Sequence, residues 1–229
     1  MRKFVFALSL LLASVFVASA QFVNFRVEGA PAFSLSSVKA HGLNVMNSGT
    51  KVGYHFGAYV DVPVSSGVYL GSGLTFAMKG NKFSQKEGSV IDEAKALLGI
   101  GESNEITMHY LQVPVNIGYK LKVSPGLRLG IQTGPYFAAA LGGTYKRGVA
   151  GVVASYNIFK EGVTNITAKR FDFGWGAAAM LYLGSYYATV GADFGLLNVS
   201  KESNQKPLPA AQSVDFRNTQ VYIGLGYSF

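Results

Sequence analysis

Cysteine is absent from this chain of 229 residues, and charged residues are scarce. The lack of cysteine excludes disulfides, thiolate catalysis, cysteine-ligated metals and anchoring through a lipidated cysteine. Charged residues make up 14% of the chain, against roughly 25% in ordinary soluble domains. Glycine and aromatic residues are abundant instead, with 28 glycines and 13% aromatic residues. The composition therefore indicates a protein with little surface facing water.

The first twenty residues have the three parts of a secretory signal peptide. In order, these are a positive start, an apolar stretch and a cleavage site of small residues: Arg2-Lys3, Phe4–Val17 and Ala18–Ala20. We expect cleavage between Ala20 and Gln21, which makes residues 1–20 the signal peptide and 21–229 the mature domain. An uncleaved membrane anchor is the alternative, and the short apolar run disfavours it. Loss of the two basic residues lowers the formal charge from +8 to +6 (8 − 2). Outside the cytoplasm, anionic lipid or polysaccharide is a more suitable partner for such a chain than nucleic acid, which we do not expect it to bind.

The chain ends on a two-residue alternation. In NTQVYIGLGYSF, the residues from Thr219 to Phe229 taken alternately are mainly apolar or aromatic, and those between them are mainly glycine or polar. A period of two is typical of β-strands, whose successive side chains point to opposite faces. The same pattern upstream predicts eight strands, at 24–34, 51–62, 67–79, 106–122, 126–140, 169–183, 186–197 and 216–229. Each is close to or above the roughly 9–11 residues that a tilted strand needs to cross a bilayer.

One segment has an alternative interpretation. FGWGAAAMLYLGSYYATVGA (173–192) is uncharged and long enough for a transmembrane helix. Its interspersed glycines and the turn signal Gly184-Ser185 favour a hairpin.

The predicted connections alternate in length. Short links rich in Gly, Ser and Pro lie at 62–67, 122–126 and 183–185, and long polar links lie near 35–50, 80–105, 141–168 and 198–215. Tight turns at one rim and long loops at the other are typical of bacterial outer-membrane barrels. Within the second long link, Ser89 and Gly99 are suited to cap a short surface helix.

Alternation alone does not say which face points outward. A secreted lipocalin-like barrel turns its apolar face inward and covers its exterior with charged residues. Here the second face carries Gly, Asn, Gln and Tyr with few charges, which suits a crowded polar interior. Trp and Tyr favour membrane interfaces, and the pattern places Trp175, Phe173 and Phe56 toward the loop rim and Tyr119, Tyr186 and Tyr227 toward the turn rim.

These features predict an all-β protein, an eight-stranded antiparallel up-and-down transmembrane β-barrel. It would be an integral protein of the cell outer membrane, surrounded by lipid and lipopolysaccharide, with both termini in the periplasm. The ending YSF resembles the C-terminal signal that the barrel-assembly machinery reads, with Tyr227 and Phe229 as its aromatic residues. Eight strands leave an interior just wide enough for side chains, so an open solute pore is not expected.

Four stretches carry a family resemblance, and they cover nearly all of the mature chain: VGYHFGAYVDVPVSSGVYLGSGLTFAMKG, HYLQVPVNIGYKL with GLRLGIQTGPYFAAAL, FDFGWGAAAML, and VYIGLGYSF. In this combination the chain resembles the PorT-like outer-membrane β-barrel family of Bacteroidetes. The first strand, FRVEGAPAFS, departs from the family's glycine-asparagine-serine pattern. The resemblance implies a non-enzymatic structural or accessory role in the cell envelope, in a secretion complex for members similar to PorT.

The titratable residues give little support for an enzyme. Of the three histidines, His41 lies in a loop, His55 on the polar face and His109 near the start of the fourth strand. Lipid A-modifying barrels combine histidine with serine and a carboxylate, and Glu105 near His109 would supply only part of that set. No histidine pair has the spacing of metal ligands. We expect no catalytic, cofactor-binding or metal-ligating residues.

The charged residues of the polar face are expected to form an interior network. Asp172 and Asp193 could bind a cation, but pairing with Arg128 or Lys120 is favoured because interior charges need partners.

Two other functions remain open. The chain could be a stand-alone surface barrel that binds lipopolysaccharide or host ligands through loop residues such as Lys146, Arg147 and Lys160. It could also be a lipid A-modifying hydrolase or acyltransferase that uses His109 or His55.

Overall fold

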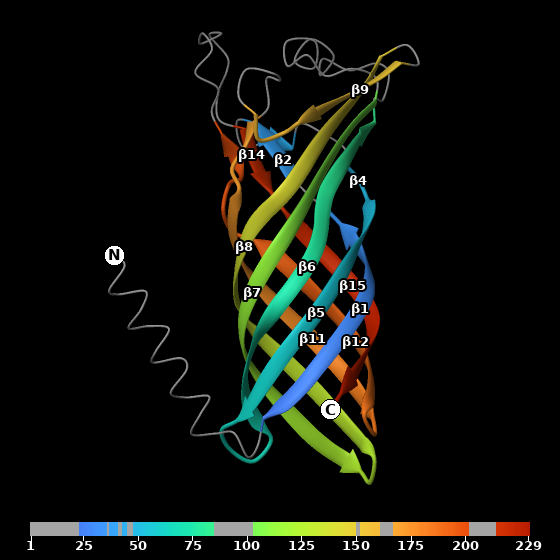
Figure 1. Ribbon diagram of the computed structural model, residues 1–229, viewed down its shortest axis with the longest axis vertical. Helices are drawn as coiled ribbons and strands as arrows, with labels where there is room; N and C mark the ends of the chain where they lie inside the picture. Colours follow the sequence, from blue (N-terminus) through green and yellow to red (C-terminus); the bar gives the residue numbers. More distant parts are fainter. Residues whose placement is uncertain are drawn as a thin grey trace, which may run out of the picture.

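The computed structural model describes residues 23–35, 37–40, 43–44, 48–84, 103–149, 152–160, 167–201 and 214–229. Eight long antiparallel strands form a closed barrel (Figure 1): β1 (Asn24–Ser34), β5 (Lys51–Pro63), β6 (Val68–Ser84), β7 (Ser103–Ser124), β8 (Leu127–Val149), β11 (Phe171–Leu183), β12 (Tyr186–Gly195) and β15 (Thr219–Ser228). Each strand pairs with the next, and β15 pairs with β1 to close the barrel. The predicted fold class is confirmed.

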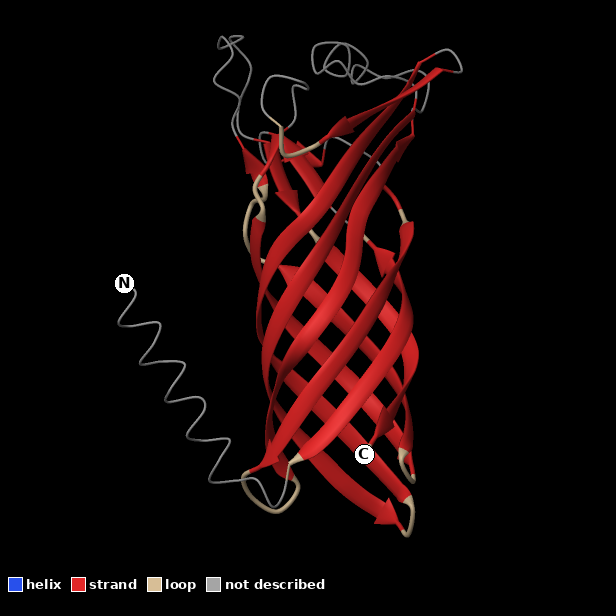
Figure 2. Ribbon diagram, viewed as in Figure 1, coloured by secondary structure: helices blue, strands red, loops and turns tan. Residues whose placement is uncertain are grey.

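Shorter strands lie at the loop end (Figure 1): β2 (Ser37–Ala40), β3 (Leu43–Asn44), β4 (Ser48–Gly49), β9 (Val152–Asn157), β10 (Thr167–Ala168), β13 (Ser200–Lys201) and β14 (Val214–Arg217). Of these, β4 and β9 extend the barrel wall by pairing with β6 and β8. Figure 2 shows that the described part of the chain consists of strands and their connections. Within the described ranges, no helix is long and apolar enough to span a membrane. The expected cap residues Ser89 and Gly99 lie outside those ranges.

Three tight turns join strands at the opposite end of the barrel, as expected. Their glycines, Gly67, Gly126 and Gly184, have φ values of 79°, 83° and 64°, a region that is costly for residues with a Cβ. The third turn joins β11 to β12, which pair in register from Gly174↔Gly195 to Leu183↔Tyr186. The segment 173–192 is therefore a hairpin.

Three wall strands are longer than the alternation predicts. Strand β6 continues to Ser84, β7 begins at Ser103 and β8 continues to Val149, so the predicted ends at 79, 106 and 140 are wrong. The backbone ladder persists where the outward side chains turn polar, as at Lys82 and Lys146. Apolar alternation marks the part of a strand that faces an apolar medium, and not the full length of its hydrogen bonding.

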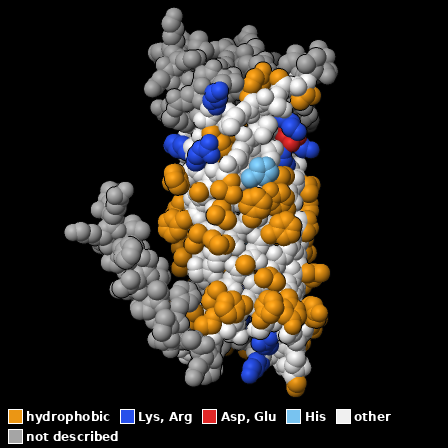
Figure 3. Space-filling view, viewed as in Figure 1, with side chains coloured by type: hydrophobic (Ala, Val, Ile, Leu, Met, Phe, Trp, Pro, Cys, Tyr) orange, Lys and Arg blue, Asp and Glu red, His pale blue; other side chains and the backbone are white. Residues whose placement is uncertain are grey.

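The apolar face points outward, as predicted. The exposed hydrophobic side chains of β7 include Leu111, Val113, Val115, Ile117, Tyr119 and Leu121. Ten residues of strand extend about 33 Å, which at a tilt of about 40° covers about 25 Å of height, the apolar band of an outer-membrane barrel. Figure 3 shows hydrophobic side chains over the middle and lower wall, with basic side chains at the two ends of this belt.

Tyrosines on the inner face lie against glycines of neighbouring strands. Tyr69 pairs with Gly118 and Tyr136 pairs with Gly174. A Cβ added at Gly118 would lie 2.2 Å from Tyr69 Cζ. Because glycine has no side chain, these rings can lie flat along the wall and fill the lumen.

Candidate functional site in the barrel lumen

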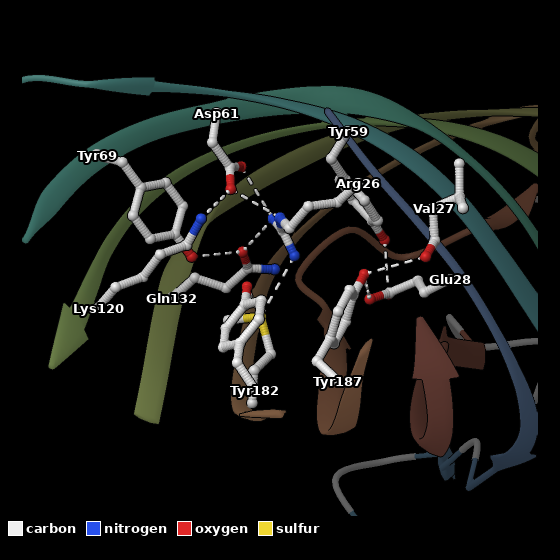
Figure 4. A network of polar contacts seen from close by, with 11 residues as sticks. Arg26, Val27, Glu28, Tyr59, Asp61, Tyr69, Lys120, Gln132, Tyr182 and Tyr187 are labelled. Carbon is white, nitrogen blue, oxygen red and sulfur yellow. Dashed lines mark hydrogen bonds and ion pairs between the residues drawn. The ribbon is translucent and has the colours of Figure 1, made fainter. Parts of the chain in front are cut away.

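The lumen is filled by two layers of polar side chains, and the layer nearer the turn rim is built around Arg26 (Figure 4). The Arg26 side chain is 1% exposed. Its Nε donates to Asp61 Oδ2 at 2.7 Å, and its Nη2 donates to Asp61 Oδ1 at 3.0 Å and to Gln132 Oε1 at 2.9 Å. Two parallel bonds to one carboxylate are the strongest geometry for this ion pair. These contacts join β1, β5 and β8 across the lumen.

Lysine and tyrosine side chains complete this layer. Lys120 Nζ donates to Asp61 Oδ2 at 2.8 Å, so the Asp61 carboxylate forms ion pairs with both Lys120 and Arg26. The Arg26 guanidinium also lies 4.9 Å from the centre of the Tyr59 ring. A desolvated cation gains further stabilisation from such a ring face.

Glu28 is buried in the lumen next to this layer. It accepts hydrogen bonds from the hydroxyls of Tyr59 at 2.9 Å and Tyr187 at 3.1 Å (Figure 4). His55 Nε2 lies 3.5 Å from Glu28 Oε1, and the imidazole stacks on the Tyr222 ring at 3.9 Å between centroids. His55 is 2% exposed, so these neighbours enclose it.

The second layer lies nearer the loop rim. Lys79 Nζ donates to the Tyr136 hydroxyl at 3.1 Å and lies 3.7 Å from Asp193 Oδ2. Gln112 Nε2 donates to the same carboxylate at 3.0 Å. Asn218 Nδ2 lies 3.5 Å from Asp172 Oδ2, at the long limit of a hydrogen bond.

A small cavity separates the two layers. It has a volume of about 20 Å³ and is lined by His55, Gln112, Gln132 and Asp193 among others. That volume holds about one water molecule, so it offers no room for a solute or a substrate.

The structure brings the four predicted network residues into the wall but not to the expected partners. Asp193 pairs with Lys79 and Lys120 pairs with Asp61, whereas Arg128 Nη2 donates to the Gly184 carbonyl at 3.0 Å near the turn rim. The expected pairing of Asp172 or Asp193 with Arg128 or Lys120 is therefore corrected. The reason is height in the barrel: Asp172 is in register with Ala138, ten residues and about 33 Å along β8 from Arg128.

Arg26, Glu28, Asp61 and Lys79 carry most of the network and were not among the predicted site residues. All four occupy inward positions of the alternation, where a charge must have a partner. The inward position of these charged residues could therefore have identified them from the sequence. For Arg26 and Glu28 this inference was harder, because the first strand departs from the family's pattern.

The histidines show no catalytic arrangement in the described part of the chain. His109 Nδ1 lies 2.8 Å from the Tyr54 hydroxyl on the outer wall, whereas Glu105 binds Lys51. His109 and Glu105 are thus not brought together, and His41 lies outside the described residues. No three described His, Asp or Glu side chains cluster as metal ligands.

Several solved outer-membrane proteins have similar structures at low sequence identity. The attachment invasion locus protein Ail of Yersinia pestis, solved in complex with the heparin analogue sucrose octasulfate, is 12% identical, with 91% of this chain and 99% of that chain covered and a TM-score of 0.45. The outer membrane protein OprG of Pseudomonas aeruginosa is 12% identical, with coverage of 91% and 96% and a TM-score of 0.45. Neisserial surface protein A is 8% identical, with coverage of 90% and 97% and a TM-score of 0.38.

Comparison with curated protein sequences gave no match. The family model described as "Outer membrane protein beta-barrel domain" matches residues 19–207, which is most of the chain. The chain therefore belongs to the family of outer-membrane proteins with this β-barrel domain.

Proposed function

We propose that this barrel is a non-enzymatic structural or accessory protein of the cell envelope, PorT-like in class, which works through its surfaces and rims in a secretion complex of Bacteroidetes. The observation that carries the proposal is the filled lumen. Two layers of paired charges cross it, and the cavity between them has a volume of about 20 Å³. A barrel filled in this way is suited neither to pass solutes nor to admit a substrate.

Removal of residues 1–20 by cleavage between Ala20 and Gln21 is part of this proposal, with 21–229 as the mature barrel domain. The start of β1 and the end of β15 lie together, because Phe229 N donates to the Phe25 carbonyl at 2.9 Å. The rim with short turns is the periplasmic rim in outer-membrane barrels, which supports a periplasmic location for both termini.

The aromatic end of β15 would serve as the signal for the barrel-assembly machinery. Phe229 is 71% exposed and stacks edge-on against Tyr227, with ring centroids 4.9 Å apart. An exposed aromatic pair beside the closing seam is accessible to a receptor before the barrel closes.

The four predicted lumen residues, Lys120, Arg128, Asp172 and Asp193, would act in the network that keeps the barrel filled and rigid. They are supporting residues of the wall and bind no external ligand in this proposal.

Crosslinking in intact cells, followed by purification from the outer membrane without boiling, tests the accessory role. A stoichiometric protein partner, together with a gel band that shifts on heating, is the expected result. Recovery of the barrel without any protein partner would contradict the accessory role, and the absence of a heat-dependent shift would contradict the barrel.

A stand-alone surface barrel that binds lipopolysaccharide is the second candidate. It is favoured by the exposed lysines Lys82 and Lys146, which lie on the outer wall above the apolar belt. Recovery with lipopolysaccharide as the sole stoichiometric component would support this role.

A further inference from the structure

Three lysines surround one carboxylate on the outer wall, above the apolar belt. Lys82, Glu105 and Lys146 are in register on the adjacent strands β6, β7 and β8. Lys51 reaches the same place from β5 and donates to Glu105 Oε1 and Thr107 Oγ1. Its side chain crosses Gly80, where an added Cβ would lie 3.2 Å from Lys51 Cδ. We call Lys51, Lys82, Glu105 and Lys146 the wall cluster.

The wall cluster carries an excess of positive charge. Three ammonium groups and one carboxylate leave a net charge of +2 (3 − 1). The hydrogen bond from Lys51 and the positive charges of Lys82 and Lys146 lower the pKa of the Glu105 carboxyl, so it is ionised at neutral pH. Within the described ranges, the ammonium groups of Lys82 and Lys146 have no ion pair or side-chain hydrogen bond, and both side chains are exposed.

Polarity falls steadily from the wall cluster toward the belt. The outward residues of β7 are Glu105, Thr107, His109, Leu111 and Val113 in order. His109 is hydrogen-bonded to Tyr54, whose ring lies 5.3 Å from that of Phe76 and 5.6 Å from that of Phe56. The change from charge to hydrocarbon takes about 20 Å along the strand. Figure 3 shows this order on one face, with basic side chains around an acidic one, a histidine below them and the hydrophobic belt below that.

We propose that the wall cluster is a binding site for the phosphate group of an anionic membrane lipid, whose acyl chains lie along the apolar outer faces of β5, β6 and β7. Lys82 and Lys146 donate to the phosphate oxygens, and Lys51 remains paired with Glu105. The aromatic group of Tyr54, His109, Phe76 and Phe56 contacts the boundary between headgroup and chains, where amphipathic rings are most stable. The site rests on the proposed location in the outer membrane and applies equally to an accessory barrel and to a stand-alone one.

The geometry favours a lipid phosphate over a free one. The cluster is on the outer wall directly above exposed apolar strands, so a bound phosphate can be joined to chains that gain contact with the belt. A free phosphate at the same exposed lysines gains only screened charge contacts, which are weak.

Titration of the purified barrel in detergent with diphosphorylated lipid A, its dephosphorylated form and inorganic phosphate tests the proposal. We expect the phosphorylated lipid to bind more tightly than either of the other two. The double substitution Lys82→Gln and Lys146→Gln should weaken that binding about tenfold, since each exposed charge contact contributes about a factor of three. Glu105→Gln should tighten it, because it raises the local net charge by one, and a loss of folding cannot produce that gain.

Lys122→Gln is the matched control, since it removes an exposed lysine elsewhere, at the turn rim. This variant should bind the phosphorylated lipid as the unaltered barrel does. Equal affinity for the two forms of lipid A, or binding unaffected by the double substitution, would overturn the site. Inorganic phosphate that binds as tightly as the lipid would overturn the lipid assignment. A missing protein partner in the crosslinking experiment would remove only the accessory role and leave this site standing.

Discussion

At the residue scale, the close packing of the wall depends on glycines that face the lumen. Gly134 on β8 leaves no space for a side chain, because an added Cβ would lie 2.0 Å from the Val115 carbonyl oxygen and 2.9 Å from Asn116 Cα. Both contacts are with backbone, which cannot turn aside as a side chain can. Gly142 on the same strand has no atom within 4 Å of the corresponding position. The two glycines therefore form a matched pair.

We expect Gly134→Ala to lower the free energy of unfolding by about 3 kcal/mol, the upper end of the usual cost of overpacking. Gly142→Ala should change it by less than about 0.5 kcal/mol. Urea unfolding in detergent, followed by the heat-dependent gel shift, measures both. Equal effects of the two substitutions would contradict the close approach of β8 to β7.

The buried charge pair allows a second prediction at this scale. Arg26→Met removes both hydrogen bonds to Asp61 and leaves that carboxylate with Lys120 as its charged partner. Breaking a buried pair costs about 3–5 kcal/mol, because a charge is left poorly compensated. Arg128→Met is the control: Arg128 is half-buried and its Nη2 donates to one backbone carbonyl, so a loss of about 1 kcal/mol is expected.

Urea unfolding of the double variant Arg26→Met with Asp61→Asn distinguishes pairing from packing. If the ion pair carries the effect, the double variant should lose much less stability than the sum of the single variants. Additive losses, or equal losses for Arg26→Met and Arg128→Met, would contradict the network as described.

At the element scale, alternation predicted the eight wall strands, their antiparallel order, the tight turns and the face that meets lipid. It did so because each strand was long enough for the pattern to repeat. The predicted ends of β6, β7 and β8 were wrong because the backbone hydrogen bonds between strands continue where the outward residues become polar, as at Lys82 and Lys146.

The lumen network was harder to predict, because the pairing of interior charges depends on the heights of strands far apart in sequence. Lys79 and Asp193 lie 114 positions apart in the chain (193 − 79) and meet only when the barrel closes. Alternation shows that both point inward, but not that they share a layer. The wall cluster was hard to predict for the same reason. Its lysines, Lys51, Lys82 and Lys146, come from three strands and meet only through the register of the sheet.

The closing strand supports a prediction about assembly. We expect Phe229→Ala to reduce the fraction of barrel that is folded in the outer membrane of growing cells, because it removes the proposed terminal signal. Phe25→Ala is the matched control, since Phe25 lies beside Phe229 at the same seam and is 54% exposed. Pulse-labelling followed by the heat-dependent gel shift measures the folded fraction over time. An equal delay in both variants would assign the effect to lost packing at the seam.

At the scale of the whole molecule, different surfaces of the barrel face different surroundings and serve different functions. The lumen is closed by paired charges and tyrosines, the middle of the outer wall meets hydrocarbon, and the wall cluster meets the headgroup region. The contacts of Arg26, Glu28 and Asp61 lie within the barrel wall itself and join five strands, β1, β5, β7, β8 and β12. A closure of this kind does not depend on the loops.

This arrangement predicts that the reconstituted barrel does not conduct ions at neutral pH. An ion would have to displace Arg26 from Asp61 and then Lys79 from Asp193, and each step uncovers a buried charge. Recordings in a planar bilayer should therefore show no steady current, and liposomes that contain the barrel should not swell in small sugars, whereas a porin reconstituted in the same way gives both signals. A stable ohmic current from the unaltered barrel would show that the two layers open in the membrane, and it would remove the main support for a role carried by the surfaces.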